Sequence, residues 1–145
     1  VLFRSRAVDS VSAGVMVTRD PFDATHRNAV YVSAKRGIGI KVVEGKRVAE
    51  QSMVDGRSGA VRRLSRSEES AELKLDAQGG VSERALDPAA AHEVLSDTQV
   101  RALAQAGQRL QQLLGGGPQD IEWAIDPQGR VVVLQARPFI ERKLL

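Results

Sequence analysis

The chain has 145 residues, no cysteine and a formal net charge of +3, a length that fits one domain. Hydrophobic residues make up 42% of the sequence and charged residues 27%, which are ordinary values for a globular protein. The absence of cysteine excludes a disulfide framework, a thiolate metal site and a cysteine nucleophile, and it is typical of a reducing compartment.

Composition also argues against a membrane protein and against a nucleic-acid-binding protein. The longest apolar runs reach only about four residues, whereas a membrane-spanning helix needs about 20. No basic segment followed by an apolar run marks a secretory leader. Aromatic residues are 3% of the chain, too few for the stacking platform that single-stranded nucleic acid requires. We therefore expect a cytoplasmic protein that binds neither membranes nor nucleic acid.

Both ends of the sequence indicate a piece of a longer protein. The chain begins with Val1 rather than Met and ends at Leu145, soon after a predicted strand. We therefore expect residues 1–10 to be a non-native or truncated lead-in, and the rest to be an incomplete domain.

The first half of the chain has the pattern of β-strands. Apolar residues alternate over residues 13–18, a period of two that is typical of a strand, and Asp20-Pro21 ends that run as a turn. A second strand is predicted at 30–33, a glycine-bearing loop at 35–39, and further strand structure between 41 and 53.

The middle of the chain, residues 55–88, is polar. It carries only short strand signals, at 60–61 and 72–75, before Gly79-Gly80 breaks the pattern. Four arginines give this stretch a positive charge: Arg57, Arg62, Arg63 and Arg66. We expect them to form the solvated face of a hairpin, because a nucleic-acid surface would need denser charge and an element that reads a groove.

One amphipathic helix is predicted after Ser96. Ser96 and Gln99 have the spacing of a capping box, and residues 115–118 supply the glycines and the proline that end helices. The apolar residues between these signals fall on one stripe: Val100, Leu103, Ala106, Leu110, Leu113 and Leu114. A helix with such a stripe packs against another element, here a sheet, so the predicted fold class is α+β.

The last segment, residues 118–138, is predicted to be a β-hairpin. Asp126-Pro127-Gln128-Gly129 has proline at the second and glycine at the fourth position of a turn, and it separates two strand-like runs. Pairing Asp126 with Gly129 places Glu122 opposite Val133 and Asp120 opposite Gln135.

In this register the hairpin has one polar and one apolar face. The polar face carries Asp120, Glu122, Gln135 and Arg137; the apolar face carries Ile121, Trp123, Ile125, Val132 and Leu134. A slip of one residue would exchange the faces. Two carboxylates, a neutral amide and an arginine fork suit Mg²⁺ bound to phosphate groups. The alternative is an ordinary solvated sheet face with salt bridges.

Three segments of the chain resemble one protein family. Residues 118–126 (PQDIEWAID) with 134–138 (LQARP) resemble the end of the nucleotide-binding domain of phosphoenolpyruvate synthase and pyruvate phosphate dikinase. Residues 12–21 (SAGVMVTRDP) resemble the SGVMFT-x-DP strand of that family, and residues 37–45 (GIGIKVVEG) resemble its GLGExxVxG segment. The resemblance implies an ATP-grasp-like fold with a largely antiparallel sheet.

The same resemblance implies roles for the polar residues of the hairpin. Glu122 and Gln135 would hold Mg²⁺ and ATP at its phosphates, and Asp120 would support the metal site. Arg137 would be the catalytic residue that contacts the transferred phosphate. The intact protein would be a dikinase-type phosphotransferase that moves phosphate from Mg–ATP to a histidine on a separate domain, and then to pyruvate or a similar acceptor.

Further implications concern the rest of the matched region. Gly14 and Thr18, in the first motif, would lie beside the nucleotide. Residues 11–140 would be the C-terminal part of the nucleotide-binding domain, and residues 141–145 would begin a linker to the phosphohistidine domain. The chain alone would be inactive, because half of the ATP cleft is missing.

The sequence departs from the family in one motif. Ile40 stands where the family segment usually has Glu, so the role of that carboxylate would be lost or would move to Glu44. His26 and His92 lie outside any glycine-rich histidine motif, and we expect them at the surface rather than as phosphate acceptors. Three alternatives stay open: a rifampicin- or glucan-type dikinase, a degenerate nucleotide-binding or regulatory module without phosphotransfer, and a structural β-rich domain with no ligand.

Overall fold

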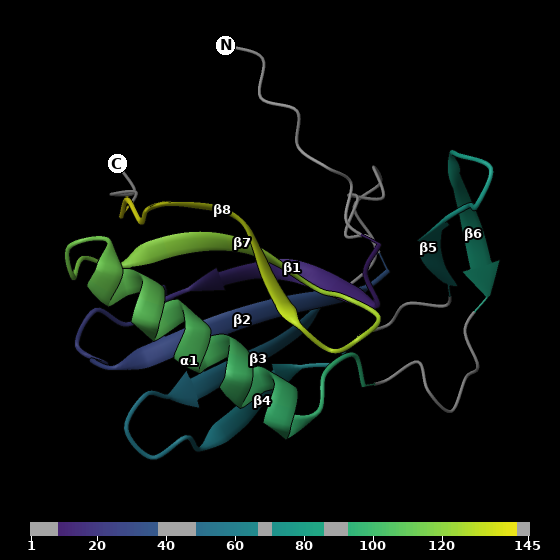
Figure 1. Ribbon diagram of the computed structural model, residues 1–145. Coiled ribbons are helices and arrows are strands. Elements are labelled where there is room, and N and C mark those ends of the chain that lie inside the picture. The colour runs from purple at the N-terminus through teal and green to yellow at the C-terminus, as the bar shows by residue number, and fades with distance from the viewer. Residues whose placement is uncertain (1–8, 38–48, 67–70, 86–92, 142–145) are drawn as a thin grey trace, which may run out of the picture.

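The computed structural model describes residues 9–37, 49–66, 71–85 and 93–141. These residues form a six-stranded antiparallel sheet with one helix packed across one of its faces (Figure 1). The prediction of an α+β fold, with a largely antiparallel sheet and a packed amphipathic helix, is therefore confirmed.

The six-stranded sheet has the order β4-β3-β2-β1-β7-β8, and β5 pairs with β6 in a separate two-stranded sheet. The elements are β1 Ser12–Val17, β2 Ala29–Arg36, β3 Glu50–Asp55, β4 Val61–Ser65, β5 Ala71–Leu75, β6 Val81–Ala85, α1 Asp97–Leu113, β7 Gln119–Ile125 and β8 Val131–Pro138.

The strand predictions are confirmed where the structure describes the chain. The alternation at 13–18 is β1, the strand predicted at 30–33 is β2, and the short signals in the middle belong to β4 and β5. The sequence analysis missed β6 (VSERA) because it has no apolar alternation, and all of its side chains are exposed. Most of the 37–45 motif, with Ile40 and Glu44, lies outside the described residues, as does His92.

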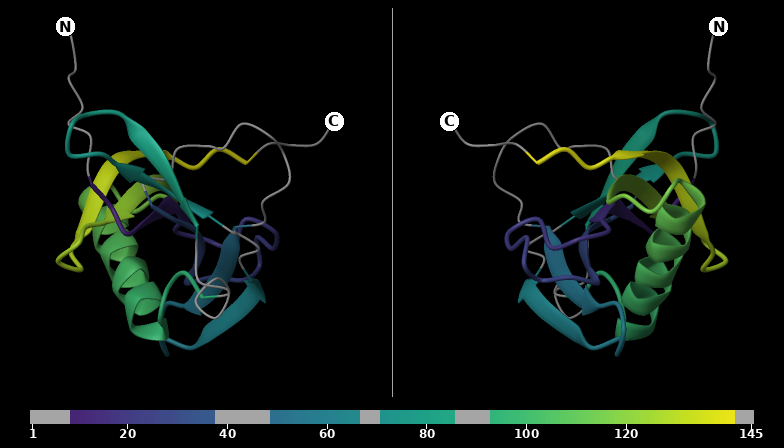
Figure 2. Two further views of the ribbon diagram at one scale, coloured as in Figure 1. Left: turned by 90° about the vertical axis from the view of Figure 1, so that its right-hand side faces the viewer. Right: turned by 90° about the vertical axis from the view of Figure 1, so that its left-hand side faces the viewer.

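Strand β1 has a neighbour on each side, β2 on one and β7 on the other. Strands β1 to β4 follow one another as an antiparallel meander, so β1 first lies at the edge. After the β5–β6 hairpin, α1 runs back over the face of the sheet, and β7 then pairs with the free side of β1 (Figure 2). This path brings the motif at the start of the chain and the hairpin at its end onto neighbouring strands.

The hydrophobic core lies between α1 and one face of the sheet. Side chains alternate across a strand, and the helix-facing set includes Met16, Val32, Ile121 and Trp123, each 0–1% exposed. We call the opposite side of the sheet the open face. The strand registers assign to it Val15, Val17, Tyr31, Ser33, Asp120 and Glu122.

The predicted capping box begins α1. The Gln99 backbone N–H donates to Ser96 Oγ over 3.2 Å, and the Ser96 N–H donates to Gln99 Oε1 over 2.9 Å. Two orphan backbone donors at the start of the helix are thereby satisfied. At the other end Gly115 and Gly116, with φ of 101° and 91°, take the left-handed conformation that ends a helix.

The predicted apolar stripe of α1 is only partly correct. Val100 and Leu103 are buried, together with Ala104 and Gly107, in the i, i+3, i+4, i+7 spacing of a packed helix face. Leu113 and Leu114, however, are 74% and 51% exposed. The last turn extends beyond the sheet, so apolar residues there have no strand to pack against.

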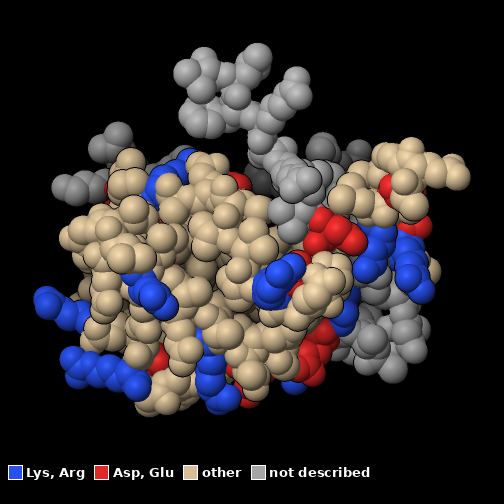
Figure 3. Space-filling model, in the orientation of Figure 1, with Lys and Arg blue, Asp and Glu red and all other residues tan. Residues whose placement is uncertain are grey.

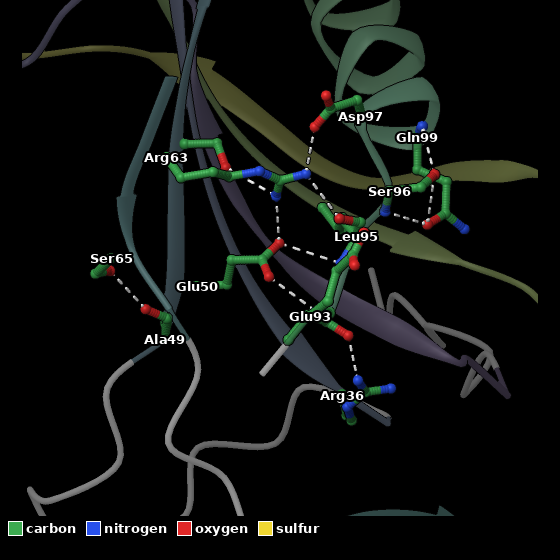
Figure 4. A network of polar contacts seen from close by, with 12 residues as sticks. Arg36, Ala49, Glu50, Arg63, Ser65, Glu93, Leu95, Ser96, Asp97 and Gln99 are labelled. Atoms are coloured by element: carbon green, nitrogen blue, oxygen red, sulfur yellow. Dashed lines mark hydrogen bonds and ion pairs between the residues drawn. The ribbon is translucent and has the colours of Figure 1, made fainter. Parts of the chain in front are cut away.

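A buried carboxylate connects the sheet to the segment that leads into α1 (Figure 4). Glu50, at the start of β3, is 3% exposed. Its oxygens accept hydrogen bonds from Arg63 Nη1 at 2.8 Å and from the backbone N–H groups of Val94 and Leu95 at 2.8 and 3.1 Å. Arg63 also donates to Asp97 Oδ1 over 2.7 Å and to the Leu95 carbonyl over 2.9 Å.

This arrangement corrects one expectation about the arginines of the middle segment. Arg57, Arg62 and Arg66 are exposed, as expected of a solvated face, but the side chain of Arg63 is only 25% exposed. Sequence patterns did not indicate this role, because the buried partner of Arg63 lies 13 residues earlier and its contacts with Leu95 and Asp97 lie more than 30 residues later.

A second buried carboxylate organises the loop after β1. Asp20 is 5% exposed and accepts hydrogen bonds from the N–H groups of Phe22 and Asp23, while His26 Nδ1 lies 2.9 Å from Asp20 Oδ2. Burial by itself raises the pKa of Asp20, but the hydrogen bonds from His26 and the two backbone groups outweigh it and hold the pKa below its usual value of 3.8. His26, expected at the surface, is partly exposed at 36% and is held by this contact.

Within the described parts of the chain, no helix is long and apolar enough to cross a membrane.

Glu50→Ala is expected to destabilise the fold by about 3–5 kcal/mol, because it removes the buried partner of the Arg63 charge, which keeps the exposed Asp97 as an ion-pair partner, and leaves two backbone donors unsatisfied. Asp97→Asn, which weakens only the outer part of the same network, is the control and should cost no more than about 1 kcal/mol. Urea unfolding of both variants measures the difference. Equal stability of Glu50→Ala and the wild type would contradict the role given to this carboxylate.

The Asp20 carboxylate should make the fold acid-sensitive. Because its pKa is lower in the folded state than in the unfolded chain, it adds stability above pH 3.8, and this stability is lost as pH falls through the folded-state pKa. Asp20→Asn should therefore flatten the acid limb of the stability profile, measured by urea unfolding between pH 2 and 6. Asp76→Asn in the separate β5–β6 hairpin is the control. An acid limb unchanged by Asp20→Asn would refute this assignment.

Candidate functional site

The β7–β8 hairpin forms around the predicted turn. The Gly129 N–H donates to the Asp126 carbonyl over 2.9 Å, and Gly129 has φ of 81°, a left-handed conformation that glycine adopts at no steric cost. Asp126 Oδ1 accepts from the Gln128 and Arg130 N–H groups at 3.0 and 2.8 Å. These bonds hold the pKa of Asp126 below its usual value, the Arg130 N–H contributing most.

The register of the hairpin differs from the predicted one. Next to the turn Ile125 lies opposite Val131 and Trp123 opposite Val133; a shift then follows, and Glu122 lies opposite Gln135. β8 therefore has one more residue than β7 at this point, which is a β-bulge. The prediction that Glu122 faces Val133, and Asp120 faces Gln135, was wrong for two reasons. Asp126 pairs with Arg130 rather than Gly129, so the loop is one residue longer than predicted, and the bulge adds a second residue.

The bulge explains which predicted faces are correct. Beyond it the register differs from the prediction by two residues, which leaves each side chain on its predicted face. Next to the turn the register differs from the prediction by one residue. Val131 and Val133 therefore lie on the apolar face, which had been predicted to carry Val132 and Leu134. Val131 packs against the core, whereas Leu134 is 50% exposed.

Beyond the bulge, the four polar residues gather on the open face. Asp120 lies opposite Arg137 and Glu122 lies opposite Gln135, as two cross-strand pairs in consecutive rows on one face. Both Nε and Nη2 of Arg137 donate to Asp120 Oδ2 over 3.2 Å. The Arg137 side chain is 68% exposed and that of Asp120 is 24% exposed, so the pair is reachable from solvent.

Glu122 is exposed, and its carboxylate makes no hydrogen bond or ion pair with the other described residues. Gln135 is also exposed. A pocket of about 610 Å³ adjoins the Asp120–Arg137 pair. It is lined by Pro21, Asp120, Arg137, Pro138, Phe139, Ile140 and Glu141.

The donor set fits a magnesium ion that is held partly by phosphate. No group of three His, Cys, Asp or Glu side chains with metal-binding geometry occurs in the described ranges, so the protein does not offer a closed metal cage there. Mg²⁺ prefers one or two carboxylates together with substrate phosphate oxygens. Glu122, Asp120 and the amide oxygen of Gln135 are oxygen donors of that kind.

Gly14 and Thr18 lie on the other side of the sheet. A side chain on Gly14 would overlap the Ser33 carbonyl oxygen and come within 3.1 Å of the Trp123 indole. Thr18 is 6% exposed; its Oγ1 accepts from the Gln119 N–H over 2.8 Å, and its methyl group lies beside Gly107 of α1. The structure therefore brings Asp120, Glu122, Gln135 and Arg137 together but not these two residues.

The pocket has neighbours that the sequence analysis did not single out. Arg19, directly after β1, lies over the ring of Phe139 and pairs with Glu141. In the SGVMFT-x-DP motif Arg19 occupies the variable position, so the motif itself carries no signal for it. The contact joins residues 122 apart in the chain, which no local pattern indicates.

On the side that carries α1, the described Lys and Arg side chains are interspersed with Asp and Glu over the surface (Figure 3).

Gly14→Ala tests whether Gly14 serves packing. The added methyl group has no free space, so the variant should lose about 1–3 kcal/mol of stability, as overpacked cores do. Chemical unfolding measures this loss, and Gly129→Ala, a turn glycine with open space around it, shows the cost of backbone strain alone. Full stability of Gly14→Ala would contradict a packing role.

Known proteins are similar to this chain over most of its length. Residues 4–143 match the family described as pyruvate phosphate dikinase, AMP/ATP-binding domain. A probable phosphoenolpyruvate synthase of Methanothermobacter thermautotrophicus is 33% identical over 133 residues, covering 91% of this chain and 19% of the relative. The phosphoenolpyruvate synthase of Pyrococcus furiosus is 27% identical over 146 residues, covering 95% and 18%.

A rifampicin phosphotransferase from Streptomyces sp is also similar, with 31% identity over 135 residues, covering 92% of this chain and 15% of the relative. The chain spans less than a fifth of the length of each of these three relatives. The resemblance stated from the three motifs is confirmed, and the fold agrees with it. The chain belongs to the family of pyruvate phosphate dikinase AMP/ATP-binding domains.

Proposed function

We propose that the chain is the C-terminal part of the ATP-binding domain of a phosphoenolpyruvate synthase-like phosphotransferase, and that it binds the phosphates of Mg–ATP on the open face of the β7–β8 hairpin. The observation that carries this proposal is the pair of cross-strand rows, Asp120 with Arg137 and Glu122 with Gln135, on one exposed face. Family membership supports ATP as the nucleotide.

The four side chains have complementary tasks in this proposal. Glu122 and Gln135 offer a carboxylate and an amide oxygen side by side, and they would hold the metal. Magnesium, when bound, would neutralise charge on the phosphate oxygens. Asp120 orients the Arg137 guanidinium through two hydrogen bonds to one oxygen, and Arg137 would turn its remaining donors to the transferred phosphate. Phosphoryl transfer needs this positioning and charge neutralisation more than covalent chemistry.

The acceptor lies outside the chain. We propose that phosphate passes to a histidine of a separate domain and from there to pyruvate or a similar small molecule; residues 11–140 form the ATP-binding part and 141–145 begin the linker. The names of the phosphoenolpyruvate synthases among its relatives support pyruvate. The rifampicin phosphotransferase among them favours an antibiotic as the second candidate acceptor. A cytoplasmic location stays a prediction.

A nucleotide-binding module without phosphotransfer is the competing function. Ile40, in place of the usual Glu, favours it. Incubation of the full-length protein with Mg–ATP distinguishes the phosphotransferase from the binding module. Phosphohistidine formation supports the enzyme, whereas binding of ATP without transfer supports the module.

Glu122→Gln and Arg137→Ala test the proposed site. Each removes a charged group that would bind the metal or a phosphate, an interaction whose loss lowers affinity by about 10- to 100-fold. The measurement is titration calorimetry of Mg–ATP binding to the full-length protein. Arg130→Ala is the control for Arg137→Ala: it removes the same positive charge from the turn of the same hairpin and should leave the affinity for Mg–ATP unchanged. Unchanged affinity in both site variants would refute the proposed site.

A further inference from the structure

Arg19 connects the end of β1 to the segment that follows β8. Its Cζ lies 5.4 Å from the centroid of the Phe139 ring, within the range of a cation–π contact. Its Nη2 lies 3.4 Å from Glu141 Oε1. The side chain is only 23% exposed, so this guanidinium is largely enclosed by its contacts.

The segment held by Arg19 has few other attachments. β8 ends at Pro138, and a proline has no N–H with which to continue a ladder. The Phe139 N–H donates to the Pro118 carbonyl over 2.9 Å. Among the described residues, the Arg19 contacts and this bond are the hydrogen-bonding, ionic and cation–π contacts that join residues 139–141 to the rest of the chain.

That segment is also one wall of the pocket beside Arg137. Phe139, Ile140 and Glu141 line it together with Asp120 and Arg137. A displacement of the segment would therefore change the shape of the pocket. The side chain of Arg137 leaves the chain only two residues before Phe139, so the same displacement would disturb its direction.

Charge gives a second argument for Arg19. The pocket is lined by two carboxylates, Asp120 and Glu141, which would repel phosphate if both were uncompensated. Asp120 is paired with Arg137 at 3.2 Å and Glu141 with Arg19 at 3.4 Å. Each carboxylate of the pocket thus has its own arginine.

We propose that Arg19 is a positioning residue of the phosphate pocket: it fixes residues 139–141 as a wall of the pocket and neutralises Glu141, so that a polyphosphate can approach Arg137. Arg19 acts through Phe139 and Glu141 and does not itself line the pocket. This inference rests on the proposed function, because it takes Mg–ATP as the occupant.

The test is calorimetric binding of the Mg²⁺ complex of a non-hydrolysable ATP analogue to the full-length protein. Arg19→Ala should raise Kd about three- to tenfold, since it removes one ion pair and one cation–π contact. Arg19→Lys, which keeps the charge, should bind within about twofold of the wild type. Adding Glu141→Gln to Arg19→Ala should recover part of the lost affinity, because it removes the uncompensated carboxylate but does not restore the contact with the Phe139 ring. A structural role alone would not be rescued by that second change.

Phe139→Leu keeps Arg19 but removes the aromatic ring that Arg19 contacts. It provides a second measurement if Arg19→Ala does not fold, and a raised Kd of this variant supports the proposal. Wild-type affinity of Arg19→Ala or of Phe139→Leu, or absence of rescue by Glu141→Gln, would overturn it. The site variants Glu122→Gln and Arg137→Ala are measured in parallel. If they weaken binding and the Arg19 variants do not, only this inference fails; if none weakens binding, the proposed function fails with it.

Discussion

The buried carboxylate of Glu50 holds together three parts of the fold that are distant in sequence. It lies in β3, binds Arg63 of β4, and accepts the backbone N–H groups of Val94 and Leu95 just before α1. A buried charge must be compensated, and here the compensation comes from both the sheet and the segment leading to the helix. The start of α1 is thereby fixed over the β3–β4 edge, from which the helix crosses the face of the sheet to its other side.

The path of α1 determines where β7 joins the sheet and which of its side chains are exposed. By returning across one face, the helix delivers β7 to the free side of β1 and covers Met16, Ile121 and Trp123. The alternate residues of the same strands then point away from α1. Asp120 and Glu122 are accessible to solvent because α1 covers only the opposite face of the sheet. In the register beyond the bulge they lie opposite Arg137 and Gln135. The polar surface on which we propose that phosphate binds thus follows from the packing of an apolar face.

The gathering of the four polar side chains on one face could be predicted because these residues lie close together in the sequence. Asp120, Glu122, Gln135 and Arg137 occupy alternate positions of two strands joined by a recognisable turn, and a period of two keeps such residues on one face. The exact partners were wrong, because the turn is one residue longer than predicted and a β-bulge inserts a further residue, both without a sequence signal. Leu113 and Leu114 were assigned to the core for a similar reason: helical periodicity does not indicate where the sheet beneath the helix ends.

By itself, the sequence determined the strands with clear alternation, the capped helix, the hairpin turn and the membership in an ATP-binding family, since each depends on neighbouring residues or on a contiguous motif. Only the tertiary structure decided that Arg63 is bound to a buried carboxylate, that Gly14 and Thr18 face the core, and that Arg19 meets Phe139 and Glu141. These last facts depend on contacts between different strands and segments of the folded chain, and neither periodicity nor spacing along the chain carries information about such contacts.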